Sequence, residues 1–319
     1  MRTDISQKTA ILSLLLLTFS TVWLLAADLP EIRRRGVLRV AARPVSTLIF
    51  SPGNSEFPGF CYEIAREFAG SQDLEIAVQL VNSFGAYWQH SDDNRSLSLF
   101  QEVDLYAEIL TVTSDRQELL SMVPYVDNTE ILVGRADSRA TELSDLRGKR
   151  VAVIEGMSFQ QVLEDALSQQ EIAYRLVPAA LKGGAIVPRD RAQGGHEQGQ
   201  GVEEVQLFLL PPGMPTTLMF FPGQLTLDSV DFFVADSFSL FHQLNVSQSL
   251  RSLVRPLFPV NGAVGELALG TSSDTPQLTN TLSRWMTEFR TTAAYESLVQ
   301  RYLGISYDRY CAFIEDFPQ

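Results

Sequence analysis

Apolar runs and amphipathic segments alternate along the chain. The apolar-rich run 37–42 is typical of a buried strand, and apolar residues recur at helical spacing through 59–69. The patterns of 74–81 and 103–113 again favour strands, while 88–100 between them is mixed and helix-like at its end. This order of strand, helix, strand, helix and strand predicts an α/β domain with a mainly parallel sheet.

The same alternation returns in the second half of the chain. The short apolar segment 129–134 is where we expect the chain to cross into a second lobe. The apolar run 151–154 predicts a buried strand that leads through a glycine turn into a helix at 159–167. Further strands and helices are expected at 29–35 (helix), 205–210, 230–236 and 267–270 (strands), and 278–289 and 293–302 (helices).

A chain of 319 residues is long enough for two domains of ordinary size. We expect lobe 1 to comprise residues 29–132 and 268–319, and lobe 2 to comprise residues 133–267. Residues 182–201 are rich in glycine, glutamine and charge, with almost no large apolar side chain. This stretch predicts an inserted mobile surface loop within lobe 2.

Residues 1–28 have the features of an export segment. Two basic residues precede an apolar run, 10–27, that ends in a pair of alanines, as in a secretory signal. The run is also about long enough to span a bilayer, and a leucine stands three positions before the expected cleavage point. A cleaved signal peptide and a retained N-terminal membrane anchor both remain open, and either one exports the rest of the chain.

Charge and composition exclude several classes of function. A net charge of −13 argues against a nucleic-acid partner, because phosphate contacts need clustered lysine and arginine. The three histidines, His90, His196 and His242, show no metal-ligand spacing, so no metal site and no cofactor are expected. The two cysteines, Cys61 and Cys311, are either a disulfide of an oxidising compartment or two small buried side chains.

The most informative stretch lies at the end of the strand predicted for 103–113. The strand ends in threonines, and Arg116 follows five residues after Thr111. An arginine presents a planar fork of donors that matches a carboxylate and keeps its charge. The alternatives are a clamp for a ligand carboxylate and an arginine that caps a helix or lies in solvent.

A second candidate site follows the strand at 151–154. The turn that ends in Met157 and Ser158 leads into a helix, and backbone N–H groups at a helix N-terminus bind anions. The turn is too short for a dinucleotide fingerprint or a P-loop, which leaves little room for a nucleotide.

Taken in order, these segments resemble the bacterial extracellular solute-binding proteins of family 3, the polar amino-acid type. The stretches that carry the likeness are 29–40, 59–65, 110–116, 148–153 and 230–236. The resemblance implies a type 2 periplasmic binding fold, the two-lobed "venus flytrap", located in the periplasm or tethered to the inner membrane.

Within that family the chain looks most similar to the binding domain of the membrane-bound lytic transglycosylases F. The segments 46–50 and 235–237 and the ending 301–304 with 307–313 carry this second likeness. A catalytic domain follows the binding domain in that family. Because this chain stops at Gln319, we expect it to lack that domain.

The resemblance assigns expected roles to single residues. It implies that Arg116 grips a ligand α-carboxylate, that Thr111 adds a hydroxyl and an N–H, and that the turn at Met157 and Ser158 adds further donors. It also implies that Asp236 takes the α-ammonium group, while an N-cap role before the next helix is the alternative. One hydroxyl of the family pattern is missing, because Met157 stands where the family usually has serine or threonine.

Three further residues are open between binding and structural roles. Glu108 replaces part of the usual glycine-containing segment, so it either lines the cleft or pairs with a nearby arginine. Phe50 and Tyr125 either stack on a ligand or pack in the core.

The resemblance favours a non-enzymatic periplasmic receptor for a small carboxylate-bearing ligand, an amino acid or short peptide, that serves an ABC transporter of the inner membrane or senses the cell wall. One alternative is a degenerate module that acts through protein contacts at the cell envelope. The other is a dehydratase-like enzyme on the same fold, with Glu108 and Glu155 as the suspected carboxylates.

Overall fold

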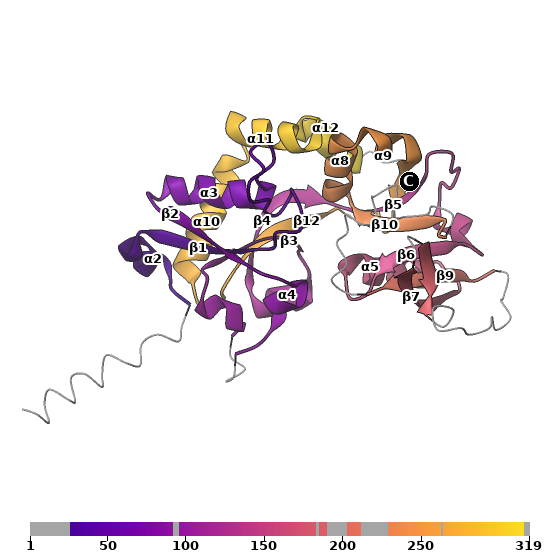
Figure 1. Cartoon of the computed structure of the whole chain (residues 1–319), viewed down its shortest axis with the longest axis horizontal. Helices are drawn as coiled ribbons and strands as arrows, with labels where there is room; N and C mark the ends of the chain where they lie inside the picture. The colour runs from indigo at the N-terminus through magenta and orange to yellow at the C-terminus, as the bar shows by residue number, and fades with distance from the viewer. Residues whose placement is uncertain are drawn as a thin grey trace, which may run out of the picture.

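The computed structural model describes residues 26–91, 96–182, 185–189, 203–211, 229–262 and 264–315, and it consists of two lobes side by side (Figure 1). Most of the predicted export segment, residues 1–25, lies outside these ranges. Across the described ranges, no helix combines the length and apolar character needed to cross a membrane.

Lobe 1 is built on a five-stranded mixed sheet in the order β2-β1-β3-β12-β4. Strand β1 pairs in parallel with β2 and β3, whereas β12 runs antiparallel to both β3 and β4. The strands are β1 (Val37–Ala42), β2 (Glu75–Leu80), β3 (Leu105–Thr111), β4 (Ser121–Asn128) and β12 (Gly265–Thr271). The helices of this half are α2 (Leu29–Arg35), α3 (Phe60–Ser71), η1 (Phe84–Trp88), η2 (Ser98–Gln101), α4 (Ser114–Leu119), α10 (Pro276–Phe289), α11 (Ala293–Leu303) and α12 (Tyr307–Glu315).

Lobe 2 is built on a seven-stranded mixed sheet in the order β11-β5-β10-β6-β9-β7-β8. Its centre, from β10 through β6 and β9 to β7, is parallel, and antiparallel strands lie on both sides. The strands are β5 (Glu130–Arg135), β6 (Arg150–Ile154), β7 (Tyr174–Lys182), β8 (Ala185–Pro188), β9 (Val205–Leu210), β10 (Phe232–Asp236) and β11 (Val254–Pro259). Its helices are η3 (Leu143–Leu146), α5 (Ser158–Gln169), α8 (Ser237–Val246) and α9 (Gln248–Leu253).

The predicted two-lobed α/β class is therefore confirmed, with sheets that are mixed in both lobes. The apolar runs identified the parallel strands β1, β3 and β6 because both faces of these strands are covered. Strands β4 and β7 were missed. Neither strand has a continuous buried apolar run, because partly buried residues interrupt the buried ones in β4 and mostly partly buried or exposed residues make up β7, and both include a proline.

The chain crosses between the lobes twice. It passes from β4 to β5 at Thr129 and returns between β11 and β12. The lobe boundaries expected at 132/133 and 267/268 fall inside β5 and β12. Each strand is apolar on both sides of the expected boundary, so the sequence gives no sign of where the lobe changes. Part of the surface loop expected at 182–201 is ordered structure, since β8 forms an antiparallel hairpin with β7. Residues 183, 184 and 190–201 of that segment lie outside the described ranges.

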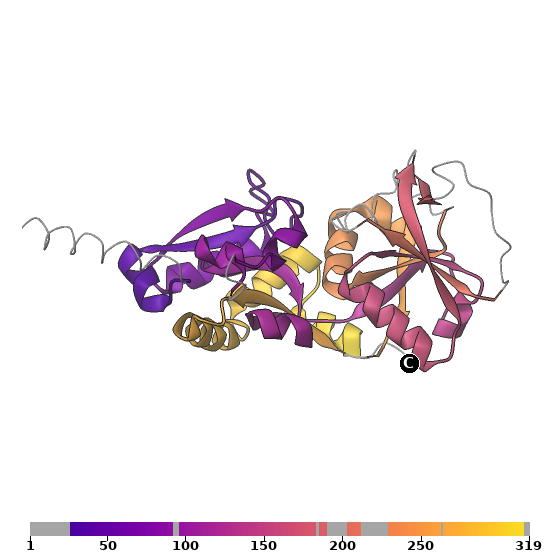
Figure 2. The same ribbon diagram turned by 90° about the horizontal axis from the view of Figure 1, so that it is seen from below.

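Helices α8 and α12 pack beside the β4–β5 crossing and form hydrogen bonds there. Helix α8 starts from a strand of lobe 2, yet Phe238 on it is buried in the core of lobe 1, 4.8 Å from the ring of Phe60. The hydroxyl groups of Tyr310 on α12 and Ser237 on α8 lie 2.6 Å apart. Ser237 in turn donates to the Asn128 side chain beside the crossing, at 3.1 Å. In Figures 1 and 2 the C-terminal helices, in yellow, lie next to the junction of the lobes.

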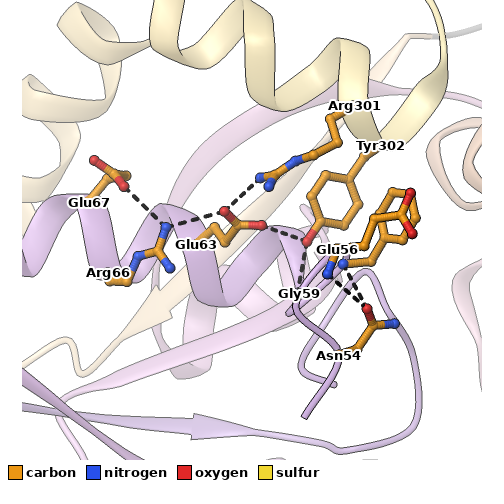
Figure 3. A network of polar contacts seen from close by, with 9 residues as sticks. Asn54, Glu56, Gly59, Glu63, Arg66, Glu67, Arg301 and Tyr302 are labelled. Atoms are coloured by element: carbon orange, nitrogen blue, oxygen red, sulfur yellow. Dashed lines mark hydrogen bonds and ion pairs between the residues drawn. The ribbon is translucent and has the colours of Figure 1, made fainter. Parts of the chain in front are cut away.

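A polar network anchors the loop that precedes α3 (Figure 3). Gly59 has φ 132°, and a Cβ there would lie 2.3 Å from the carbonyl oxygen of Ile49, so the position requires glycine. The Gly59 N–H donates to the Tyr302 hydroxyl at 2.9 Å, which itself donates to Glu63 at 2.7 Å. Arg301 completes the network with a 2.6 Å ion pair to Glu63, so that α11 holds both α3 and the loop.

The two cysteines are free thiols. Cys61 is buried in the core of lobe 1, with its Sγ 3.4 Å from the Tyr125 hydroxyl, and Cys311 is half-buried on α12. Of the two interpretations, small unbridged side chains fit the structure.

Candidate functional site

The site begins at the end of β3, where Arg116 folds back over the strand. Thr113 caps α4 by accepting a hydrogen bond from the Arg116 N–H at 3.3 Å. This turn directs the Arg116 side chain backwards, and its Nη1 donates to the Thr111 carbonyl at 2.8 Å. The predicted proximity of Thr111 and Arg116 is thus what the local chain geometry produces.

Two aromatic rings of η1 hold the Arg116 guanidinium from the other side. Its central carbon lies 5.6 Å from the ring centroid of Phe84 and 5.3 Å from that of Trp88. Burial lowers the pKa of Arg116, while the negative charges of Glu108 and Glu130 raise it. No carboxylate in the described part of the chain forms an ion pair with this guanidinium. The group is therefore a partly desolvated cation with most of its five donors available.

The other lobe approaches the same point through the start of α5. The Ser158 Oγ lies 3.2 Å from the Thr111 Oγ1, which is a direct hydrogen bond between the lobes. Figure 1 shows α4 and α5 facing each other across the space between the lobes. Met157 occupies the N-cap of α5 without a side-chain hydrogen bond, so the substitution noted in the sequence leaves this helix end uncapped by a side chain.

A pair of carboxylates lies beside Ser158. Glu130 and Asp236 are directly opposite each other in the antiparallel pairing of β5 and β10, and both side chains are buried. Burial and the negative charge of Asp236 raise the pKa of Glu130 to about 7. The Ser158 hydroxyl and the Arg116 charge act in the opposite direction on the pKa of Glu130. Two carboxylates in one desolvated place cannot both ionise freely.

The two carboxylates differ in how well they are satisfied. Asp236 caps α8, because it accepts a 2.7 Å hydrogen bond from the Ser239 N–H, and burial raises its pKa. The helix-capping interpretation of Asp236 is therefore what the structure shows directly. Glu130 Oε1, by contrast, has no hydrogen-bond partner among the described residues although it is buried.

Glu108 belongs to a different, closed pair. Its carboxylate accepts hydrogen bonds from Arg43 Nε at 2.6 Å and Arg43 Nη2 at 3.1 Å, and the residue is 0% exposed. Of the two alternatives for Glu108, the pair with a nearby arginine is the one that the structure contains. The cause is local: Arg43 directly follows β1, beside β3 in the sheet, where its fork reaches Glu108.

The remaining candidates divide between core and surface. Tyr125 is fully buried in the core of lobe 1, so core packing is its role. Phe50 is half-buried at the start of the loop anchored through Gly59, with its ring 5.0 Å from that of Tyr62. Glu155 lies in the turn before α5, where 47% of its side chain is exposed and Arg189 is 3.8 Å away. In the described ranges, no three potential metal ligands gather into a cation site.

Sequence reasoning missed four residues that shape the site: Arg43, Phe84, Trp88 and Glu130. Two of them could have been found from the sequence, because each is a charged residue at the end of a buried strand: Arg43 follows β1, and Glu130 begins β5. The aromatic pair on η1 carried no such signal, since nothing in a short mixed segment indicates that its rings will meet an arginine from α4.

Comparison with solved structures defines the class of fold. The chain is similar to an ABC uptake transporter substrate binding protein from Streptococcus pneumoniae with bound histidine, with a TM-score of 0.60 and 14% identity over 87% of this chain and 96% of the other. An ancestral amino acid-binding protein described as a precursor of cyclohexadienyl dehydratase gives a TM-score of 0.57 and 15% identity over 86% and 98%. The chain therefore has the two-lobed fold of periplasmic amino-acid-binding proteins.

Sequence comparison identifies a relative with higher sequence identity over part of the chain. Over 138 residues, 43% of this chain, it is 30% identical to membrane-bound lytic murein transglycosylase F from Ectopseudomonas mendocina (strain ymp). The match spans only 27% of the length of that relative. The resemblance inferred from the motifs is thereby confirmed. No protein-family model matches the chain.

Proposed function

We propose that the protein is a non-enzymatic solute-binding protein for a small carboxylate-bearing ligand, an amino acid or short peptide. The observation that carries this proposal is the state of Arg116. Its guanidinium is partly desolvated against two aromatic rings of η1, at the contact of the two lobes, and no carboxylate of the described chain pairs with it.

Electrostatics favours an anionic ligand at this place. A desolvated charge is costly unless it is paired and hydrogen-bonded. A ligand carboxylate would occupy the free donors of Arg116 in the bidentate geometry that arginine favours. The N-terminus of α5, which has no side-chain cap, would add N–H groups and a favourable dipole from the other lobe.

A ligand held in this way contacts both lobes. Thr111 and Arg116 come from lobe 1, and Ser158 comes from lobe 2. Neither lobe alone satisfies the ligand, so binding should favour the arrangement in which the lobes are close. This is the mechanical property that a transport receptor or a sensor needs.

The biological setting follows by analogy with the relatives. The pneumococcal structure is named as part of an ABC uptake transporter, and the transglycosylase relative is named as membrane-bound and murein-acting. We place the protein in the periplasm, free or tethered to the inner membrane. There it serves either an inner-membrane transporter or the sensing of cell-wall fragments.

A thermal-shift screen tests this function. The probes are the standard amino acids and a set of muropeptides. A ligand at about one hundred times its dissociation constant should stabilise the protein by about 2.7 kcal/mol. In Arg116→Ala the affinity should fall by about 2–5 kcal/mol, typical for the loss of one partner of a buried charge pair.

The matched control is Arg34→Ala, which removes an arginine whose side chain is 79% exposed and whose ion pair is with exposed Glu31. This variant should bind like the original protein. Absence of a shift with every probe would contradict the proposal and favour the degenerate module. Unchanged affinity in Arg116→Ala would remove that residue from the site.

A further inference from the structure

The structure points to an additional ligand contact at Glu130. We propose that Glu130 is the receptor for a cationic group of the ligand and that it loses a proton when this group binds. The inference rests on the proposed function and deepens it: it defines the ligand class as zwitterionic, with an ammonium group close to the carboxylate.

Geometry supports this role first. Glu130 begins β5 directly after the crossing at Thr129, so it lies where the two lobes meet. Only 5% of the residue is exposed, and its Oε1 has no hydrogen-bond partner among the described residues. A buried carboxylate oxygen without a partner is costly in a native protein and needs an explanation. A donor supplied by a bound ligand would provide one.

The surroundings of Glu130 match the two charges of a zwitterion. The groups that face it are Asp236 from β10, Ser158 from α5 and Arg116 from α4. Arg116 supplies the positive end of the site, and Glu130 with Asp236 supplies the negative end. Asp236 accepts the Ser239 N–H at Oδ1 as the cap of α8, whereas Glu130 Oε1 is a buried carboxylate oxygen without a hydrogen-bond partner among the described residues.

Protonation follows from the same contacts. Without a ligand, burial and Asp236 raise the pKa of Glu130 to about 7, so a large fraction of the molecules carry a proton there at neutral pH. An ammonium group at Oε1 favours the ionised carboxylate and therefore expels that proton. Affinity for an amino acid should rise as the pH increases from about 5 to about 8, and binding should release protons.

Calorimetry on the wild-type chain tests the proton release without any variant. The best-binding amino acid from the screen is titrated at pH 7.5 in phosphate and in Tris, two buffers with different enthalpies of ionisation. We expect the apparent binding enthalpy to differ between the buffers by the amount that corresponds to release of a fraction of a proton. Equal enthalpies would overturn the proposal.

The variant Glu130→Gln tests the contact itself. The comparison ligand is the α-hydroxy acid with the same side chain, which keeps the carboxylate and replaces the ammonium by a hydroxyl. In wild type the amino acid should bind far more tightly than the hydroxy acid, and in Glu130→Gln this preference should fall by about thirtyfold or more. The variant should also lose the buffer dependence.

Glu118→Gln is the matched control, because it makes the same charge change at an exposed position on α4. It should keep the preference and the proton release. A Glu130→Gln protein that keeps both would overturn the role of Glu130 and leave the proposed function standing. A wild-type protein that binds no amino acid would overturn both proposals together.

Discussion

The protein contains two neighbouring sets of an arginine and a carboxylate. One set, inside lobe 1, forms an ion pair, and the other, where the lobes meet, does not. Arg43 and Glu108 form a buried, two-pronged ion pair at 2.6 and 3.1 Å. Arg116 and Glu130 lie within electrostatic reach of each other without pairing, and each keeps unused hydrogen-bonding groups. Both arginines lie against the same ring, that of Phe84.

The difference separates structural charges from charges that await a ligand. A complete pair stabilises its lobe and has nothing left to offer. An incomplete set at the meeting point of two lobes destabilises the empty protein and is relieved when a ligand brings the missing partners. Four changes test this distinction.

The largest effect is expected from breaking the complete pair. Glu108→Ala leaves Arg43 buried without a counterion and should reduce the free energy of unfolding by about 3–5 kcal/mol. Urea denaturation measures this loss, with the exposed Glu118→Ala as the control. A loss below about 1 kcal/mol would mean that the pair is not the structural element described above.

The incomplete set should make stability depend on pH. Because the pKa of Glu130 is raised to about 7 in the folded protein, the folded state binds more protons than the unfolded state between about pH 4.5 and 7. The contribution of Glu130 to stability is therefore present at low pH and lost as the pH rises through 7, by on the order of 3 kcal/mol.

The difference in urea stability between wild type and Glu130→Gln, followed from pH 4.5 to 8, isolates this contribution. It should shift in favour of the variant as the pH rises. The subtraction removes the effect of His242, whose pKa burial lowers to about 4 in both proteins. A difference that is independent of pH would contradict the account of Glu130.

A smaller effect is expected where the backbone positions Arg116. Thr113→Ala removes the side-chain cap of α4 and should cost about 1 kcal/mol of stability. Because the same cap orients Arg116, amino-acid affinity should also fall in this variant. Thr292→Ala, which removes the equivalent cap of α11, serves as control and should lose stability while keeping affinity.

The smallest effect concerns the aromatic support of Arg116. Trp88→Leu removes one of the two rings beside the guanidinium and should weaken amino-acid binding by about 0.5–1 kcal/mol, the usual size of such a contact at a partly exposed site. Calorimetric titration measures it. A loss as large as that of Arg116→Ala would show that Trp88 contacts the ligand itself.

Much of the fold could be predicted from the sequence because its signals are local. The buried strands β1 and β6 have apolar runs, and α10 and α11 have apolar residues at helical spacing. Strand β4 and helix α12 carry weaker local signals. Contacts with segments that are distant in sequence stabilise them. Tyr310 of α12, for example, donates to the carbonyl of Asp127 at 2.9 Å.

The candidate site divides in the same way. The positions of Thr111 and Arg116 follow from the six-residue segment 111–116, so a local pattern was sufficient. The raised pKa of Glu130 comes from burial and from Asp236, which is distant in sequence but stands opposite Glu130 in the sheet, and strand pairing cannot be read from a single sequence. The sequence left two possible roles for Glu108, and its ion pair with Arg43 in the structure identifies the structural one.

The central claim is that an amino acid bridges Arg116 and Glu130 between the lobes, and a crystal structure with the best-binding amino acid tests it most directly. The account predicts the ligand carboxylate at about 2.7–2.9 Å from guanidinium nitrogens of Arg116, with the ammonium group at Glu130 Oε1. A ligand bound elsewhere, or bound between the lobes with its carboxylate turned away from Arg116, would contradict it.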